Sequence, residues 1–206
     1  IAVNGTNRSI TSTLANASII INGNKVVTGI GNLVLATNVN LFLNKGFNCG
    51  AGNKTTINGT LQINLGGFVS LNAPVYGNAS LLKYNSNSTF NRDIEWNKNI
   101  GTLFGVPNNV QISNNTILNY PYRLIGNPPP GPLGMTGNLI IDAGSSMFMD
   151  FNTVSAGGAL TINGNLTTAG NLTLGLVLGD DLRIAGNLDF SSGYTFDAKN
   201  RAIFFT

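Results

Sequence analysis

The first residues with a spacing suited to chemistry are two acids in Arg92-Asp-Ile-Glu-Trp96. If this segment is a strand, Asp93 and Glu95 share a face, and paired carboxylates can act as acid and base or nucleophile in glycoside hydrolysis. Such positions are ~7 Å apart on one strand, and no second cluster of acids offers substrate contacts. We therefore predict a structural ion pair between Arg92 and Glu95, beside Trp96, and no enzyme activity or catalytic residue.

A second acidic pair, Asp180 and Asp181, could bind Ca²⁺ through its carboxylates. The Asp-containing nonapeptide repeat of calcium-binding coils is missing, so a solvated turn with an Asp–Arg183 pair is the preferred interpretation. The chain has no His and a single Cys, Cys49, which excludes common zinc sites, His-based triads and an internal disulfide. We expect no metal and no cofactor.

Aromatic side chains provide a different lead. Tyr120 and Tyr122 flank Pro121, and an aromatic face beside Asn amides is a common way to bind a sugar ring. These two tyrosines are candidate carbohydrate-binding residues, and packing in the core is the alternative.

The charge content excludes other functions. Only 9% of the 206 residues are charged, and the net charge is +3, against ~25% charged residues in a typical soluble domain. The lysines are scattered, whereas a nucleic-acid groove needs a stripe of cations. No apolar run reaches the ~18 residues of a membrane span. We expect neither a nucleic-acid partner nor a membrane span.

Short apolar runs bounded by Asn or Gly recur along the chain and predict strands separated by turns, with almost no helix. The unit Gly-Asn-Leu begins at residues 31, 137, 164, 170 and 186. A short step between such units fits one side of a coil, and steps of ~16–25 residues fit a complete turn of a right-handed parallel β-solenoid with three short faces. In such a coil, Asn residues at the bends would form ladders between turns. The alternative is an antiparallel β-sandwich, because Asn-Gly also marks hairpins.

Two stretches interrupt the solenoid pattern, the polar segment 85–96 and the proline-rich segment 119–133. Residues 119–133 contain five of the seven prolines, and Pro lacks the N–H that a strand ladder needs. This predicts a β-solenoid block at 1–118, in which 1–72 has the weaker pattern, a proline-rich loop at 119–133, and a second block at 134–206. The chain begins at Ile1 and ends inside an apparent strand, so we expect it to continue in a longer protein.

A succession of segments carries a resemblance over roughly residues 73–206. These segments are 75–85, Arg92-Asp-Ile-Glu-Trp96, 107–112, 137–145, 160–166 and 200–206. The succession resembles the β-helical segments of very large surface and secreted adhesin-like proteins of gliding bacteria that use type IX secretion.

The resemblance implies an exported, non-enzymatic structural or adhesive segment, secreted or at the cell surface, that acts as a stiff stalk or display scaffold. Its partners would be neighbouring domains of the same longer chain, the secretion machinery or surface glycans. The alternative is a carbohydrate-binding or polysaccharide-cleaving β-helix.

Overall fold

The computed structural model describes residues 1–5, 7–98, 100–121, 132–150, 157–191 and 193–206. Within these ranges the chain is all-β, with one 3₁₀ turn, η1 (Ile94–Trp96). None of the described segments forms a helix of the length and hydropathy needed to cross a membrane. The all-β prediction is confirmed.

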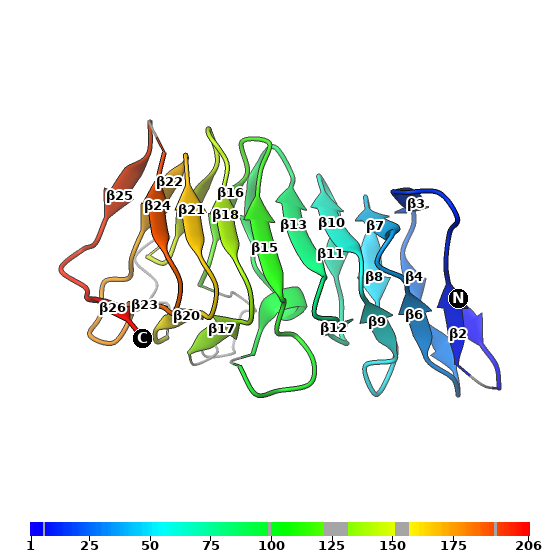
Figure 1. Ribbon diagram of the computed structural model, residues 1–206. Helices are drawn as coiled ribbons and strands as arrows, with labels where there is room; N and C mark the ends of the chain where they lie inside the picture. The colour runs from blue at the N-terminus through cyan, green and yellow to red at the C-terminus, as the bar shows by residue number, and fades with distance from the viewer. Residues whose placement is uncertain (6, 99, 122–131, 151–156, 192) are drawn as a thin grey trace.

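The largest sheet has eight strands, and all its pairings are parallel. Figure 1 shows these strands side by side along the molecule, with the two termini at opposite ends. Their bounds in chain order are β3 (Ala17–Ile21), β7 (Val39–Leu43), β10 (Thr60–Asn64), β13 (Leu81–Asn85), β15 (Asn109–Ile112), β18 (Leu139–Ile141), β21 (Leu166–Thr168) and β24 (Leu188–Phe190).

The chain leaves this sheet and returns to it one strand further along. Leu41 of β7 pairs with Leu61 of β10, and Val110 of β15 pairs with Leu139 of β18. All pairings between the described strands are parallel, so the hairpin interpretation of Asn-Gly, and with it the antiparallel sandwich, is wrong for these strands. The arrangement is consistent with a β-solenoid.

Smaller parallel sheets complete the coils, and they change near the middle of the chain. The sheets of the first part comprise β1 (Ala2–Val3) with β5 (Thr28–Gly29); β2 (Arg8–Ile10), β6 (Leu33–Leu35), β9 (Thr55–Ile57) and β12 (Val75–Tyr76); and β4 (Lys25–Val26), β8 (Gly46–Asn48) and β11 (Phe68–Val69). Those of the second part comprise β14 (Thr89–Asn91), β16 (Ile117–Asn119), β19 (Ser146–Phe148), β22 (Asn171–Thr173) and β25 (Thr195–Asp197); and β17 (Leu133–Met135), β20 (Leu160–Ile162), β23 (Leu182–Ile184) and β26 (Ile203–Phe205). Among the described strands, only those of the eight-stranded sheet run through both parts.

Alternating side chains of the eight-stranded sheet form continuous rows, as the period of two in a strand requires. One inward row consists of Ile19, Leu41, Leu61, Leu82, Val110, Leu139, Leu166 and Leu188. An outward row consists of Ile20, Phe42, Gln62, Lys83, Gln111, Ile140, Thr167 and Asp189. The inward rows and the facing sides of the smaller sheets form one buried core.

The predicted asparagine ladders are present, and the described residues form two kinds. In the first, Asn44 Nδ2 donates to Asn22 Oδ1 (2.6 Å), Asn64 Nδ2 to Asn44 Oδ1 (2.8 Å), and Asn85 Nδ2 to Asn64 Oδ1 (3.1 Å). This ladder joins side chain to side chain at the carboxyl ends of strands in the eight-stranded sheet.

The second ladder lies at the amino ends of later strands in the same sheet. Here the Oδ1 of one asparagine accepts the backbone N–H of the next: Asn109 from Asn138 (3.0 Å), Asn138 from Asn165 (2.8 Å) and Asn165 from Asn187 (2.8 Å). It satisfies a backbone donor at each bend, a group that proteins seldom leave unpaired.

This second ladder explains most of the Gly-Asn-Leu units. A Cβ on Gly137, Gly164 or Gly186 would lie 2.4 or 2.5 Å from the Oδ1 of the preceding ladder asparagine. Glycine is therefore needed for space, Asn continues the ladder, and Leu enters the inward row. At Gly31-Asn32-Leu33 the Asn32 N–H makes the same bond to Asn7 Oδ1 (3.0 Å).

The predicted steps between these units are partly correct. The short step from Asn165 to Asn171 leads from β21 to β22, which lie on neighbouring sides of a coil. The longer step, from Asn171 to Asn187, is not a complete turn, because it leads from β22 in one sheet to β24 in another. A full turn in this part of the chain runs from Leu166 to its partner Leu188.

Candidate functional site: a buried polar cluster and two surface grooves

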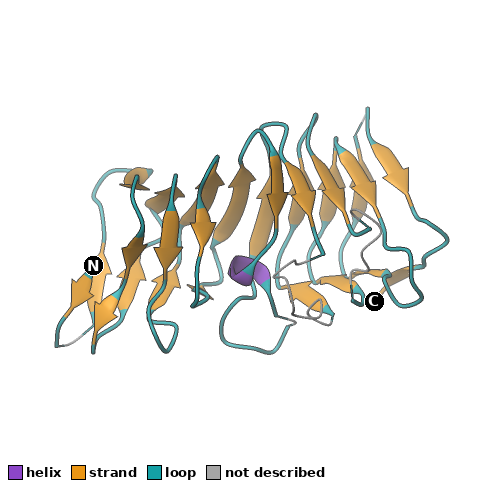
Figure 2. Cartoon of the chain, turned by 180° about the vertical axis from the view of Figure 1, so that it is seen from behind, coloured by secondary structure: helices purple, strands orange, loops and turns teal. Residues whose placement is uncertain are grey.

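Residues 92–96 do not form a strand, so Asp93 and Glu95 do not share a strand face. They form the 3₁₀ turn η1 with its flanking residues, and the Asp93 carboxylate caps the turn by accepting the Ile94 N–H (2.6 Å). Figure 2 shows this turn in purple, near the middle of the molecule. It follows β14, where the smaller sheets of the first part are replaced by those of the second.

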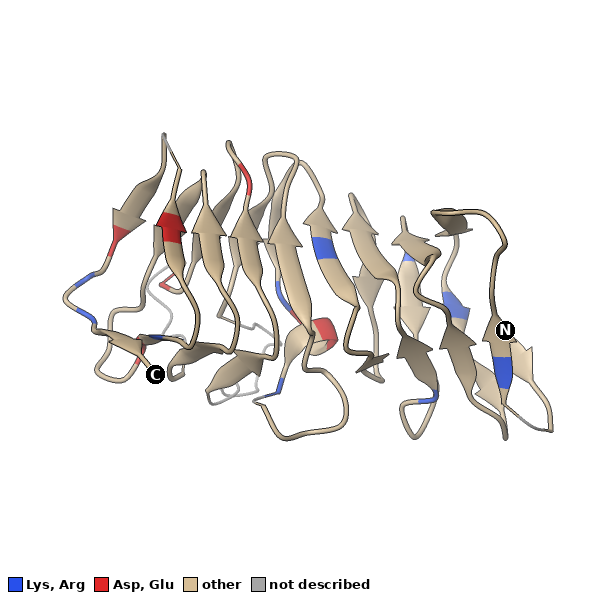
Figure 3. Cartoon of the chain, in the orientation of Figure 1, with Lys and Arg blue, Asp and Glu red and all other residues tan. Residues whose placement is uncertain are grey.

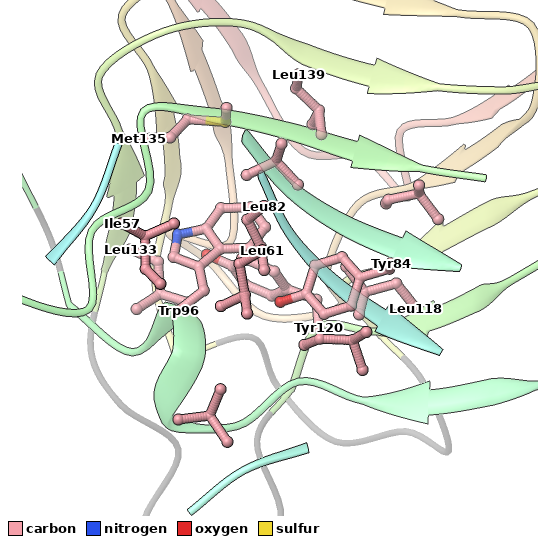
Figure 4. Packing of buried hydrophobic residues seen from close by; sticks show 14 of the residues in the cluster. Ile57, Leu61, Leu82, Tyr84, Trp96, Leu118, Tyr120, Leu133, Met135 and Leu139 are labelled. Carbon is pink, nitrogen blue, oxygen red and sulfur yellow. The ribbon is translucent and has the colours of Figure 1, made fainter. Parts of the chain in front are cut away.

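Arg92 and Trp96 connect this turn to later coils. Arg92 Nε donates to the Tyr120 carbonyl (2.7 Å), and Nη1 donates to the Trp96 carbonyl. The Trp96 indole N–H donates to the Gly134 carbonyl (3.0 Å), and its ring meets the Tyr120 ring edge-on at 5.9 Å. Figure 4 shows both rings among aliphatic side chains of several coils.

Glu95 connects the turn to β13 of its own coil and to β12 of the preceding coil. Its Oε1 accepts the Tyr84 hydroxyl (2.9 Å) and the Asp93 N–H (2.9 Å), and its backbone carbonyl accepts the Tyr76 hydroxyl (2.8 Å). Burial raises the Glu95 pKa from 4.5 to about 7, against the lowering effects of the backbone N–H bonds and Arg92. Glu95 Oε2 has no hydrogen-bond partner among the described residues.

Arg92 and Glu95, the predicted ion pair, are both fully buried in this cluster. The hydrogen bonds described for each side chain go to partners other than the opposite charge. What the two residues do together is join three consecutive coils where the smaller sheets change. The core encloses the charged side chains of Arg92 and Glu95, and Asp93 is partly buried.

Tyr120 was a candidate sugar-binding residue with core packing as the other interpretation, and the structure places it in the core. Its side chain is fully buried, packed against Trp96 and under the Arg92 guanidinium at 5.2 Å. A ring with both faces covered cannot stack on a sugar. Tyr122, the other candidate, lies outside the described residues, as does most of the predicted proline-rich loop.

The Asp180–Asp181 turn also differs from its prediction. Asp180 is buried rather than solvated, and its Oδ1 accepts the Gly158 N–H (3.0 Å). Asp181 Oδ1 accepts the Ala202 N–H (2.9 Å), while Arg183 lies over the Phe204 ring at 5.3 Å. Among the residues that the structure describes, no three acidic or thiol side chains gather as a metal site would require.

Cys49 is a buried free thiol. Burial raises its pKa to about 12, and a hydrogen bond involving Thr55 lowers it only partly. The thiolate fraction at neutral pH is therefore very small, and the thiol is unreactive.

Two grooves on the surface combine aromatic side chains with asparagines. The first, about 380 Å³, lies over β4, β8 and β11 and is lined by Asn24, Lys25, Val26, Gly46, Asn48, Phe68, Ser70 and Leu71. The second, about 700 Å³, lies near the C-terminal end and is lined by Asn165, Thr167, Gly186, Asn187, Leu188, Asp189, Phe190 and Phe205. Sequence analysis missed both, because their side chains come from strands of different coils, far apart in the sequence.

Charge is distributed unevenly along the chain, as Figure 3 shows. Residues 1–92 contain six Lys and Arg and no acid, whereas residues 93–206 contain all eight acids and five Lys and Arg. The first groove thus lies in a region with only positive charges, and the second contains Asp189.

No protein-family model matches the chain, and neither a curated protein nor a solved structure is significantly similar to it. What the chain does is therefore inferred from its own geometry.

Proposed function

We propose that the chain is a right-handed parallel β-solenoid with three short faces per coil. It would act as a non-enzymatic structural or adhesive segment, a stiff stalk or display scaffold, of a secreted or cell-surface protein. The observation that carries this proposal is the eight-stranded parallel sheet, whose rows continue in register from β3 to β24.

The mechanism is mechanical. Each coil binds the next through backbone hydrogen bonds along the long axis, and asparagine ladders add further bonds at the bends. Each coil is bonded to the coil before it and to the coil after it, so the bonded stack continues along the whole body and makes it stiff. The low charge content reduces the dependence of this packing on ionic strength. Loops between the sheets can then vary without disturbing the core.

The coil register can be tested by cross-linking. Gln62 and Lys83 are outward-facing partners on adjacent strands, and strands ~4.8 Å apart allow a disulfide between facing residues. The variant Gln62→Cys with Lys83→Cys should form an intramolecular bridge on mild oxidation. The control pairs Gln62→Cys with Gln111→Cys, one strand further away, and should not. Equal bridging in both variants would contradict the register. Cys49 will not compete, because it is buried.

The cellular role has a separate test. Antibodies against the chain should label intact cells of the producing organism or detect the protein in the medium, and external protease should remove the surface signal. Retention in the cytoplasm would contradict the exported scaffold. Release of reducing ends from polysaccharides by the purified chain would contradict the non-enzymatic role.

A carbohydrate-binding β-helix is the second candidate function. The observation in its favour is the first groove, in which the half-exposed Phe68 lies beside Asn24 and Asn48.

A further inference from the structure

The first groove has an aromatic floor. Phe68 is 40% exposed, and its ring lies against the backbone of Gly46, where an added Cβ would be 2.7 Å from Phe68 Cζ. Glycine at position 46 therefore provides the space that lets the ring rest on the sheet while remaining exposed. A ring held in this way presents an apolar surface to solvent, which a sugar ring can cover.

Two asparagines in the groove are held in fixed orientations. Asn24 Oδ1 accepts the Gly46 N–H (2.9 Å), and Asn48 Oδ1 accepts the Gly50 N–H (2.9 Å) and the Asn72 amide (2.9 Å). With both oxygens used in these bonds, the Nδ2 groups of Asn24 and Asn48 are the atoms left to donate to a ligand. A ligand for this groove therefore needs acceptor oxygens.

The charge of the residues around the first groove further restricts the class of ligand that it can bind. Lys25 lines the groove and is exposed, and no acid occurs before Asp93 in the sequence. An anion near Lys25 therefore meets no opposing carboxylate from residues 1–92. Positive potential over a neutral amide surface favours a negatively charged ligand.

One residue at the groove is held in an unusual conformation. Leu71 lines the groove with φ of 62° and 85% of its surface exposed. Bulky residues rarely adopt positive φ, and such strain is concentrated at ligand-binding positions. An exposed leucine held there extends the apolar surface beyond Phe68.

We propose that this groove binds a uronic-acid oligosaccharide. The sugar ring would cover Phe68, hydroxyl oxygens would accept from Asn24 and Asn48, and the carboxylate would face Lys25. This inference rests on the carbohydrate-binding candidate function and specifies its site and ligand class. It does not depend on the exported scaffold being correct.

The second groove provides an internal control. It also combines asparagines with an exposed aromatic residue, Phe205, which is 66% exposed. It contains Asp189 in place of a lysine, so a carboxylate-bearing sugar would be repelled there. Phe205→Ala is therefore the matched control for Phe68→Ala.

The experiment is calorimetric titration of the full chain with an oligogalacturonate and with its methyl ester, which keeps the ring but removes the charge. Binding should be detected for the acid, weaken as salt is added and be markedly weaker for the ester. Phe68→Ala should weaken binding roughly three- to tenfold, and Lys25→Gln roughly threefold. Phe205→Ala should leave it unchanged. Circular dichroism of each variant checks that it remains folded.

Several outcomes would overturn the inference. Equal affinity for the acid and the ester would show that the ligand's carboxylate is not recognised. Unchanged binding in folded Phe68→Ala would show that the ligand does not bind in the first groove. Loss in Phe205→Ala alone would place the site at the other end and leave carbohydrate binding standing. Absence of binding to both probes would reject this ligand class. The proposed scaffold would be unaffected by that result, because the cysteine cross-link tests its coil register independently.

Discussion

The two asparagine ladders use the same residue for different purposes. In the ladder from Asn22 to Asn85, amide bonds to amide, and the backbone of each coil is already satisfied by strand pairing. In the ladder from Asn109 to Asn187, each side chain accepts a backbone N–H from the next coil. The first ladder adds to a finished coil, whereas the second completes the hydrogen bonding of the bend itself.

The two parts of the molecule differ in other ways as well. They share the eight-stranded sheet but have different smaller sheets, and only the second part contains acids. The cluster around Arg92 lies where one arrangement gives way to the other. The two parts therefore consist of coils with different smaller sheets. They are joined by the continuous eight-stranded sheet and by the buried polar cluster around Arg92.

The largest expected effect on stability comes from disrupting the buried cluster around Arg92. Arg92→Met leaves the Tyr120 and Trp96 carbonyls without their donors and leaves Glu95 without a nearby positive charge. Breaking a buried charged network by removing one partner costs about 3–5 kcal/mol. Urea denaturation should show a loss of this size in the free energy of unfolding.

The control for this variant is Arg183→Met, which removes an exposed arginine that lies over Phe204. Its effect should stay within about 0.5 kcal/mol. Similar losses in both variants would mean that the cluster does not link the two parts.

The second prediction concerns pH. Because the Glu95 pKa rises from 4.5 to about 7 on folding, the folded state holds this proton more tightly than the unfolded state. The stabilising contribution is complete below about pH 4.5 and is lost as pH rises through about 7. The change amounts to about 3 kcal/mol for a shift of this size.

Glu95→Gln should abolish this pH dependence, since an amide does not titrate over this range. Unfolding free energies of both proteins, measured across that interval, provide the test. Parallel curves for the two proteins would show that Glu95 does not titrate as its burial implies.

The difference between the two asparagine ladders also explains which parts of the fold could be predicted from the sequence. The position of a coil can be recognised in the sequence at Gly164-Asn165-Leu166, because the second ladder needs a glycine for space and a leucine for the core. The first ladder places no such demand on its neighbours, so Asn44 and Asn64 resemble any other turn asparagines. The parallel strands and the ladders could therefore be predicted, and the exact turn lengths could not.

The candidate sites were less predictable for a physical reason. Arg92 and Glu95 were interpreted as a structural ion pair from their local spacing, but their hydrogen-bond partners lie elsewhere: Tyr84 in β13 and Tyr120 one coil further along. Tyr120 follows a short strand and enters the core, which its proline-rich surroundings do not reveal.

The third prediction tests the steric part of the second ladder. A Cβ on Gly164 would lie 2.4 Å from Asn138 Oδ1 and 2.6 Å from the backbone of Gly137, so Gly164→Ala must displace the preceding coil. Overpacking of this kind costs about 1–3 kcal/mol. Gly23→Ala, where nothing lies within 4 Å of the added atom, should be neutral or slightly stabilising. Thermal melts that fail to separate the two variants would contradict the steric explanation of Gly-Asn-Leu.

The smallest effect distinguishes the two ladders directly. Asn165→Ala removes the acceptor of the Asn187 N–H, and loss of one such bond costs about 1 kcal/mol. Asn64→Ala breaks more bonds, to Asn44, Asn85 and Gln62, but all of them join half-buried side chains that water can reach. Its effect should therefore be smaller, roughly 0.5 kcal/mol. Amide hydrogen exchange provides a second measurement, since Asn165→Ala should speed exchange at Asn187, whereas Asn64→Ala should leave backbone protection in β13 intact. If Asn64→Ala proves the more damaging change, the first ladder is not an addition to a finished coil but a part of what holds the coil together.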